Sequence, residues 1–90
     1  SYVFALKADN AEVLAHPIKP NLVGKNLLHV KDKNGVMLFA EFAKIGTSAS
    51  GKGWVDYVWP KPGEKAPSPK HSYIEKIPGE NITFGAGYHD

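Results

Sequence analysis

The chain has 90 residues, so we expect one domain covering residues 1–90, and its 42% hydrophobic and 22% charged residues are typical of a soluble globular protein. Its formal net charge is only +2, and the eleven basic residues are lysines spread along the chain, which argues against a nucleic-acid partner. Since there is no cysteine, disulfides, thiolate catalysis and cysteine-based zinc sites are excluded.

The first predicted elements are two strands joined as a hairpin. Residues 2–6 are rich in β-forming side chains, Asp9 and Asn10 suit a turn, and residues 13–15 resume the apolar pattern. Pro17 ends the second strand because proline has no backbone N–H to donate. The chain begins inside an apolar stretch, so we expect it to be a fragment of a longer protein.

A helix is predicted after a polar connection. Residues 19–28 form a connecting segment with a short helical turn at residues 26–28, and residues 32–35 form a polar turn. Apolar side chains spaced three and four apart then indicate an amphipathic helix over residues 36–44, with Gly46 as its C-terminal cap.

Three more strands follow. Residues 53–59 are the most strand-like run, residues 61–69 are predicted to be a loop, and residues 71–77 and 82–88 are the last two strands. The order β-β-α-β-β-β predicts an α+β fold, a PAS-like or profilin-like five-stranded antiparallel sheet with short helices.

Apolar side chains fall on both faces of this predicted sheet. In the third strand, Val55, Tyr57 and Trp59 point to one face, while Trp54 and Val58 point to the other. An antiparallel sheet with one wet face should alternate more cleanly between apolar and polar residues. Because one short helix cannot cover both faces, we expect an upstream helix missing from this chain, or a homodimer partner, to cover the second.

Aromatic residues and a lysine of the third and fourth strands are the first candidates for a ligand-binding pocket. Tyr57 and Trp59 share a strand face and can wall a cavity, although ordinary core aromatics would have the same pattern. The Lys70 ammonium can donate to a carboxylate, and the alternative is an exposed lysine at the strand entry. Strict alternation puts Lys70 and Tyr73 on opposite faces, so both can line one pocket only if Lys70 lies in the loop.

Two further residues complete the candidate ligand-binding set. His16 lies at a strand end, where it can donate to a ligand, titrate near its ordinary pKa of about 6.5, or hold a turn by a hydrogen bond. Phe4, on the first strand, is the sixth candidate. The other histidines, His29, His71 and His89, are interpreted as surface residues because they lack the spacing of a metal site.

No catalytic set is recognisable in the sequence. None of the serines lies in a nucleophile-elbow motif, and residues 46–53 lack the spacing of a phosphate-binding loop. Asp56 is the one acid with a candidate buried setting, and we interpret it as a structural hydrogen-bond partner. We therefore predict no enzyme activity, no metal site and no cofactor.

Five short segments in order along the chain resemble the single Cache domain family. They are VLAHP at 13–17, LVGKNL at 22–27, GWVDYVWP at 53–60, PKHSY at 69–73 and FGAGYHD at 84–90. The resemblance implies a PAS-like sheet preceded by a long N-terminal helix that this chain lacks. It also implies a periplasmic or extracellular position at a prokaryotic membrane, as the sensing part of a chemoreceptor, a histidine kinase or a cyclic-dinucleotide enzyme, or as a free periplasmic protein.

The resemblance further implies a ligand class. Single Cache domains commonly bind small carboxylates such as acetate, propionate, pyruvate or lactate. Because the chain has no arginine, a carboxylate would be held by lysine, histidine, hydroxyl groups or backbone N–H groups. The leading hypothesis is a small-carboxylate sensor for chemotaxis or two-component signalling within a membrane-anchored parent protein. The alternative is a protein-interaction or dimerisation module without a small ligand.

Overall fold

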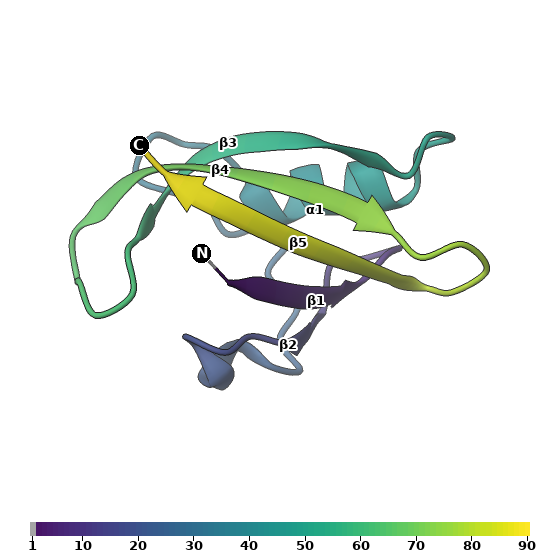
Figure 1. The fold of residues 1–90 in the computed structure, drawn as a ribbon, viewed down its shortest axis with the longest axis horizontal. Coiled ribbons are helices and arrows are strands. Elements are labelled where there is room, and N and C mark those ends of the chain that lie inside the picture. The colour runs from purple at the N-terminus through teal and green to yellow at the C-terminus, as the bar shows by residue number, and fades with distance from the viewer. Residues whose placement is uncertain (1) are drawn as a thin grey trace.

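A five-stranded antiparallel sheet forms the centre of the computed structural model, which describes residues 2–90 (Figure 1). The strands are β1 (Val3–Lys7), β2 (Val13–Ala15), β3 (Lys52–Pro60), β4 (Pro67–Lys76) and β5 (Ile82–His89). They lie in the order β2-β1-β5-β4-β3, and every neighbouring pair is antiparallel. The predicted α+β class and the predicted order of elements are confirmed.

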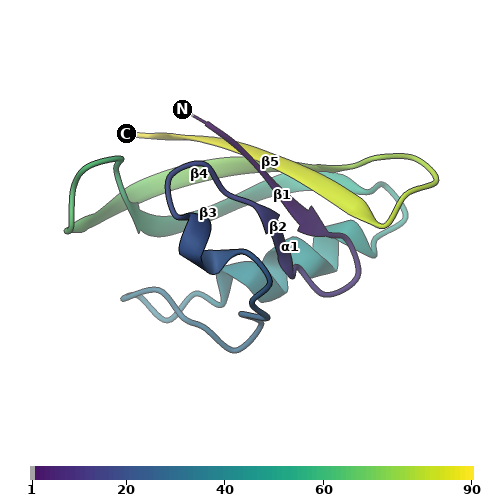
Figure 2. The same cartoon turned by 90° about the horizontal axis from the view of Figure 1, so that it is seen from below.

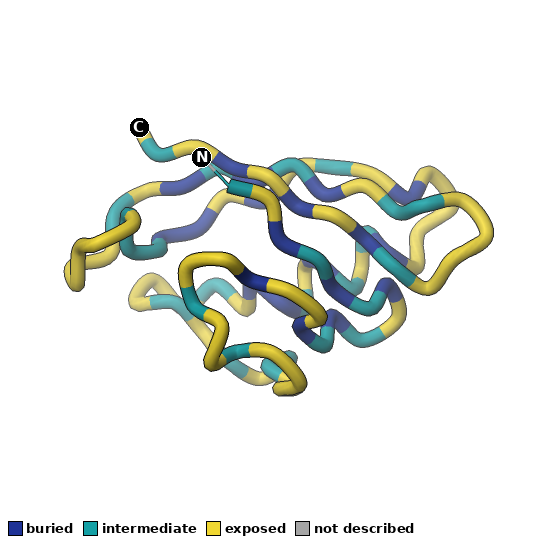
Figure 3. Tube along the Cα trace, turned by 60° about the horizontal axis from the view of Figure 1, so that its bottom comes forward, coloured by how far each residue is buried: buried dark blue, intermediate teal, exposed yellow. Residues whose placement is uncertain are grey.

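One face of the sheet, called the inner face below, is covered by helix α1 (Leu38–Gly46) and by the connection that holds the short 3-10 helix η1 (Pro20–Leu22), as Figure 2 shows. Leu38, Phe39 and Phe42 of α1 pack against the sheet and are at most 3% exposed. The connection itself runs mostly over the surface (Figure 3). The core therefore lies between α1 and the inner face. Its buried side chains are Phe4, Leu6, Ala11, Val13, Leu38, Phe39, Phe42, Val55, Tyr57 and Ile74.

Helix α1 begins later than the predicted residue 36 because Asp32 holds the preceding turn. The backbone N–H of Val36 donates to the Asp32 carboxylate at 2.8 Å, and the backbone N–H of Asp32 donates to the Val36 carbonyl at 2.8 Å. These two bonds close a turn that keeps Val36 outside the helix. The other Asp32 carboxylate oxygen accepts the backbone N–H of Val58 at 2.9 Å, so this side chain also satisfies a donor on the edge strand β3.

The prediction that residues 61–69 form a loop is wrong at its C-terminal end, because β4 begins at Pro67. Pro67 pairs with Pro60 at the far end of the β3–β4 ladder. The fixed φ of proline is compatible with extended backbone, and its missing N–H is tolerated at the first residue of a strand. The early start of β4 places Lys70 inside the strand instead of the loop.

Two smaller predictions also need correction. The short helical turn predicted at residues 26–28 is absent there, because the Asn26 side-chain oxygen accepts the Leu28 N–H at 3.2 Å and forms a local turn. Gly46 is the last residue of α1 and not a left-handed cap. A Cβ at Gly46 would collide with the carbonyl of Ala8, so glycine lets the helix end approach the backbone beyond β1.

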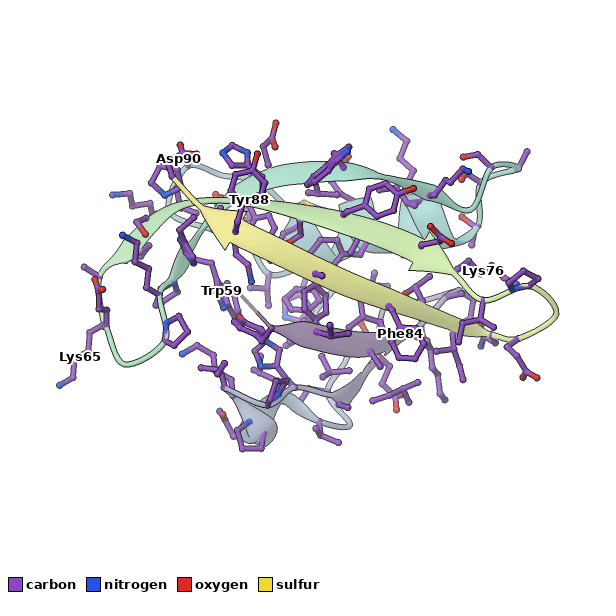
Figure 4. All side chains as sticks on the ribbon, viewed as in Figure 1. Trp59, Lys65, Lys76, Phe84, Tyr88 and Asp90 are labelled. Atoms are coloured by element: carbon purple, nitrogen blue, oxygen red, sulfur yellow. The ribbon has the colours of Figure 1, made fainter. Side chains whose placement is uncertain are left out.

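The opposite face of the sheet, called the outer face below, exposes several apolar side chains. Trp54 and Tyr88 are 59% and 55% exposed, and their ring centroids lie 6.2 Å apart. The ring centroid of Tyr73 lies 5.2 Å from that of Trp54. Val3 and Phe84 are also exposed, and Figure 4 shows Phe84 and Tyr88 extending from β5. Apolar side chains therefore lie on both faces, while the element that covers the outer face stays a prediction.

Candidate ligand-binding pocket

The centre of the candidate site is Lys70, which lies on β4 and is only 2% exposed. Its register partners are Tyr57 on β3 and His89 on β5. Alternation along β4 puts Lys70 on the inner face together with the buried residues Ser72 and Ile74. Lys70 is therefore a buried lysine under the helical layer, and not an exposed residue at the strand entry.

Aromatic rings surround the Lys70 amine. Nζ lies 4.2 Å from the ring centroid of Tyr2, 5.4 Å from that of Phe4 and 5.8 Å from that of Tyr57, and it donates to the Tyr2 hydroxyl at 3.0 Å. Within residues 2–90, no carboxylate lies within ion-pair distance of this amine. Burial lowers the pKa of Lys70 to about 8. Near neutral pH the amine is thus mostly protonated, with no opposite charge beside it from the described part of the chain.

Two glycines of β5 make room for these side chains. A Cβ at Gly87 would lie 2.8 Å from Cε of Lys70 and would collide with Oγ of Ser72. A Cβ at Gly85 would overlap the ring of Phe4. Glycine within a strand often marks the close approach of another group, and here the groups that approach are side chains from the neighbouring strands β1 and β4.

A small cavity beside Lys70 lies between α1 and the inner face of the sheet. It is lined by Phe4, His16, Leu38, Phe39, Phe42, Tyr57, Trp59 and Lys70. Its volume of about 10 Å³ is roughly the space of one water molecule. The hydroxyl of Tyr57 bonds the Ser72 hydroxyl at 2.8 Å, and Trp59 is the partly buried member of the wall. The cavity is therefore mainly aromatic and has one cationic group.

His16 contributes a neutral donor to the same pocket. It is 7% exposed, and its ring centroid lies 5.8 Å from that of Phe4 and 6.3 Å from that of Trp59. The backbone N–H of Lys19 donates to Nδ1 at 2.9 Å, which places the proton of the neutral imidazole on Nε2. Burial, together with the positive charges of Lys70 and Lys19, lowers the pKa of His16 to about 4. His16 therefore holds its turn, as one predicted alternative had it, and does not titrate near 6.5.

Five of the six predicted ligand-binding residues come together in this pocket: Phe4, His16, Tyr57, Trp59 and Lys70. Tyr73 does not join them. It lies on the outer face against Trp54, because Lys70 is inside β4 and alternation sends Tyr73 to the opposite side of the sheet.

Several residues in or next to the cavity wall were not predicted from the sequence, although the signals for them exist. Tyr2 shares the inner face with Phe4 by simple strand alternation, which could have placed it beside the pocket. Leu38 and Phe42 are four apart and lie on one face of α1 with Phe39, so the helical period could have identified them. What the sequence does not disclose is that this helix face lies against the Lys70 region of the sheet.

Two larger depressions of the surface are open to solvent and carry no buried charged side chain. Within residues 2–90, no group of three or more histidine, aspartate or glutamate side chains is placed to hold a metal ion. The cavity beside Lys70 is therefore the candidate site.

No helix within residues 2–90 is long and apolar enough to cross a membrane.

On the outer face, the two ring nitrogens of His71 are hydrogen-bonded to two different aspartate side chains. Nδ1 of His71 bonds Asp56 at 2.7 Å, and Nε2 bonds Asp90 at 2.6 Å. Hydrogen bonds to Asp56 and Asp90 raise the pKa of His71. The predicted buried setting of Asp56 is wrong, because its side chain is 77% exposed; its hydrogen-bond partner is this histidine.

Comparison with known proteins assigns the family. The Cache domain family matches residues 1–89. The chain is 32% identical over 76 residues to methyl-accepting chemotaxis protein McpP from Pseudomonas putida KT2440, an alignment that covers 84% of this chain and 14% of McpP.

Solved structures of similar proteins have the same fold. A periplasmic sensor domain of a chemotaxis protein is 35% identical with a TM-score of 0.88, and it is matched over 98% of this chain and 60% of its own. A Cache chemosensory domain whose structure describes carboxylic acid recognition is 31% identical with a TM-score of 0.89, over 98% and 58%. A methyl-accepting chemotaxis protein from Vibrio parahaemolyticus RIMD 2210633 is 33% identical with a TM-score of 0.82, over 98% and 57%.

The chain therefore belongs to the Cache domain family, the extracytoplasmic sensor domains found in chemotaxis receptors, and the predicted PAS-like fold and periplasmic or extracellular location are confirmed. It spans little more than half the length of the solved relatives and about one seventh of McpP.

Proposed function

We propose that this domain binds a short-chain carboxylate in the pocket around Lys70 and acts as the sensing part of a membrane-anchored receptor. The observation that carries the proposal is the buried Lys70 ammonium, which has no carboxylate partner within residues 2–90. A buried charge is costly unless it is paired, so an anionic ligand would supply the missing partner. The carboxylic acid recognised by a Cache domain 31% identical to this chain supports the same ligand class.

Each lining group has a task that fits such a ligand. Lys70 provides charge-assisted hydrogen bonds to a carboxylate oxygen, and Nε2–H of neutral His16 provides an uncharged donor. The rings of Phe4, Tyr57 and Trp59 form the apolar wall for a short carbon tail. With a single ammonium and no acidic group in the wall, the pocket favours a monocarboxylate over an amino acid, whose own ammonium would lack a partner.

Ligand entry is also the step that would generate a signal. Even acetate is larger than one water molecule, so a cavity of about 10 Å³ must widen when the ligand enters. Trp59 is the one lining side chain that is not fully buried, so we expect it to be the part of the wall that moves. A ligand that fits only the widened state shifts the domain towards it by the difference in its affinity for the two states. In the parent receptor this shift would pass to segments outside residues 1–90, including the expected upstream helix, without enzymatic chemistry, metal or cofactor in this domain.

Calorimetric titration with acetate, propionate, pyruvate and L-lactate, together with thermal unfolding in millimolar ligand, tests the proposal. Lys70→Met should abolish binding because it removes the ammonium and keeps the length of the side chain. Tyr73→Phe is the matched control on the outer face and should bind like the wild type. Absence of binding by the wild type, or equal binding by Lys70→Met, would refute the proposal.

A protein-interaction module is the second candidate, favoured by the exposed aromatic rings of Trp54 and Tyr88 on the outer face. Exposed aromatic groups of this kind often mark protein contacts. Sedimentation velocity over a range of concentrations would detect a homodimer formed through this face, and Trp54→Ser should then dissociate it. A wild-type chain that stays monomeric at high concentration would contradict self-association.

A further inference from the structure

We propose that Tyr2 is a positioning residue for the ligand-binding amine, and that its neutral hydroxyl holds the Lys70 ammonium in the pocket without cancelling its charge. The inference rests on the proposed function, because it gives Tyr2 a task at the same site. Tyr2 is neither one of the six ligand-binding residues predicted from the sequence nor one of the residues that line the cavity.

The geometry joins Tyr2 to both the amine and the pocket wall. Lys70 Nζ donates to the Tyr2 hydroxyl at 3.0 Å and lies 4.2 Å from the centroid of the same ring. The Tyr2 ring centroid lies 5.1 Å from that of His16 and 6.4 Å from that of Phe4, both of which line the cavity. The Tyr2 side chain thus contacts the amine by its hydroxyl and flanks the aromatic wall by its ring.

The Tyr2 hydroxyl acts as a neutral acceptor. Burial raises the pKa of Tyr2, and a hydrogen bond from the Trp59 side chain opposes this rise only in part. The hydroxyl therefore stays protonated throughout the physiological pH range. It offers Lys70 an oxygen lone pair and not a negative charge.

A neutral acceptor is what a binding lysine requires. An aspartate in place of Tyr2 would pair permanently with Lys70 and leave an anionic ligand to compete with a built-in carboxylate. Without any acceptor, the long and flexible lysine side chain would lose a charge-assisted hydrogen bond, and its amine would give up its proton more readily. A hydroxyl orients the ammonium and favours its charged form, while the charge remains for the ligand.

No other titratable group that faces Lys70 can replace this contact. The titratable groups that face Lys70 are Tyr2, directly before β1, His16 beyond β2, Tyr57 on β3 and His89 on β5. Burial lowers the pKa of His16 and of His89, and burial raises the pKa of Tyr57, so all three are neutral between pH 7 and pH 8. Within residues 2–90, the Tyr2 hydroxyl is the group that accepts a hydrogen bond from Nζ.

Substitution of the hydroxyl alone tests this role. Tyr2→Phe keeps the ring over the amine and removes the acceptor, so the pKa of Lys70 should fall from about 8 to about 7. The protonated fraction of the amine sets the apparent affinity for acetate. Acetate binding by calorimetry should therefore weaken about fivefold at pH 8 and by less than about 1.2-fold at pH 6.

A ligand-free measurement separates this inference from the proposed function. The pKa of Lys70 can be followed by NMR of its labelled side chain in the wild type, in Tyr2→Phe and in Tyr73→Phe, the matched control on the outer face. A lower pKa in Tyr2→Phe alone would support the positioning role even if no carboxylate bound. An unchanged pKa, or an equal loss of acetate affinity at pH 6 and pH 8, would overturn it.

Discussion

Replacing Lys70 by methionine should stabilise the ligand-free domain at the same time as it abolishes carboxylate binding. Burial lowers the pKa of Lys70 from 10.5 to about 8. This difference of about 2.5, at about 1.4 kcal/mol per pKa unit, corresponds to roughly 3 kcal/mol. The unfolded chain holds the proton more tightly, so the free energy of unfolding is reduced by the full amount below pH 8, and the reduction disappears as the pH rises from 8 to 10.5. Loss of the hydrogen bond to Tyr2 offsets about 1 kcal/mol, which leaves a net gain of about 2 kcal/mol near pH 7.

Urea unfolding followed by circular dichroism at pH 7 and at pH 10 measures this gain directly. Lys65→Met is the matched control, because Lys65 is exposed in the loop between β3 and β4 (Figure 4), and it should change the free energy of unfolding by less than about 0.5 kcal/mol. The gain for Lys70→Met should be present at pH 7 and much smaller at pH 10. A variant less stable than the wild type at pH 7, or a gain of the same size at both pH values, would refute the reasoning.

Three other substitutions test the surroundings of the site. Lowering the pH from 6.5 to 4 should destabilise the domain by up to about 3 kcal/mol through His16, because the unfolded chain takes up the proton first. In His16→Gln, the stability measured by thermal unfolding should fall less over this pH range. An unchanged dependence on pH would contradict the lowered pKa of His16. Gly87→Ala should cost about 1–3 kcal/mol in urea unfolding and weaken acetate binding, since its Cβ would press on the stem of Lys70; wild-type affinity in this variant would argue against the packing described. NMR titration should give His71 a pKa above 6.5 that falls in Asp56→Asn, and an equal value in both proteins would exclude the ion pair.

Strand alternation accounts for most of what could be predicted about the site. It places Tyr57 and Trp59 on one face and sends Tyr73 to the face opposite Lys70, as the structure has them. The open question was whether Lys70 belonged to the strand or to the loop before it. That depends on Pro67 joining β4, which is decided by pairing with β3 and not by any local preference of the proline-rich segment.

Contacts between distant segments account for what could not be predicted. The backbone donors satisfied by Asp32 include Val58, which lies on the edge strand far along the chain, so a local reading of the polar turn cannot reveal that role. The burial of Lys70 depends on the absence of a side chain at Gly87, its diagonal neighbour on β5. Neither residue alone indicates a buried amine, because an isolated lysine in a strand is most often exposed.

The two tryptophans of the chain lie on opposite faces of the sheet, Trp59 in the wall of the pocket and Trp54 exposed on the outer face. Indole emission is sensitive to local polarity, so each face has its own fluorophore. Trp54→Phe leaves a protein whose fluorescence reports on the pocket, and Trp59→Phe leaves one that reports on the outer face. Stopped-flow mixing of each variant with acetate would then time an event on one side of the sheet against an event on the other. A change that reached Trp54 after Trp59 would give the speed at which a signal crosses the sheet.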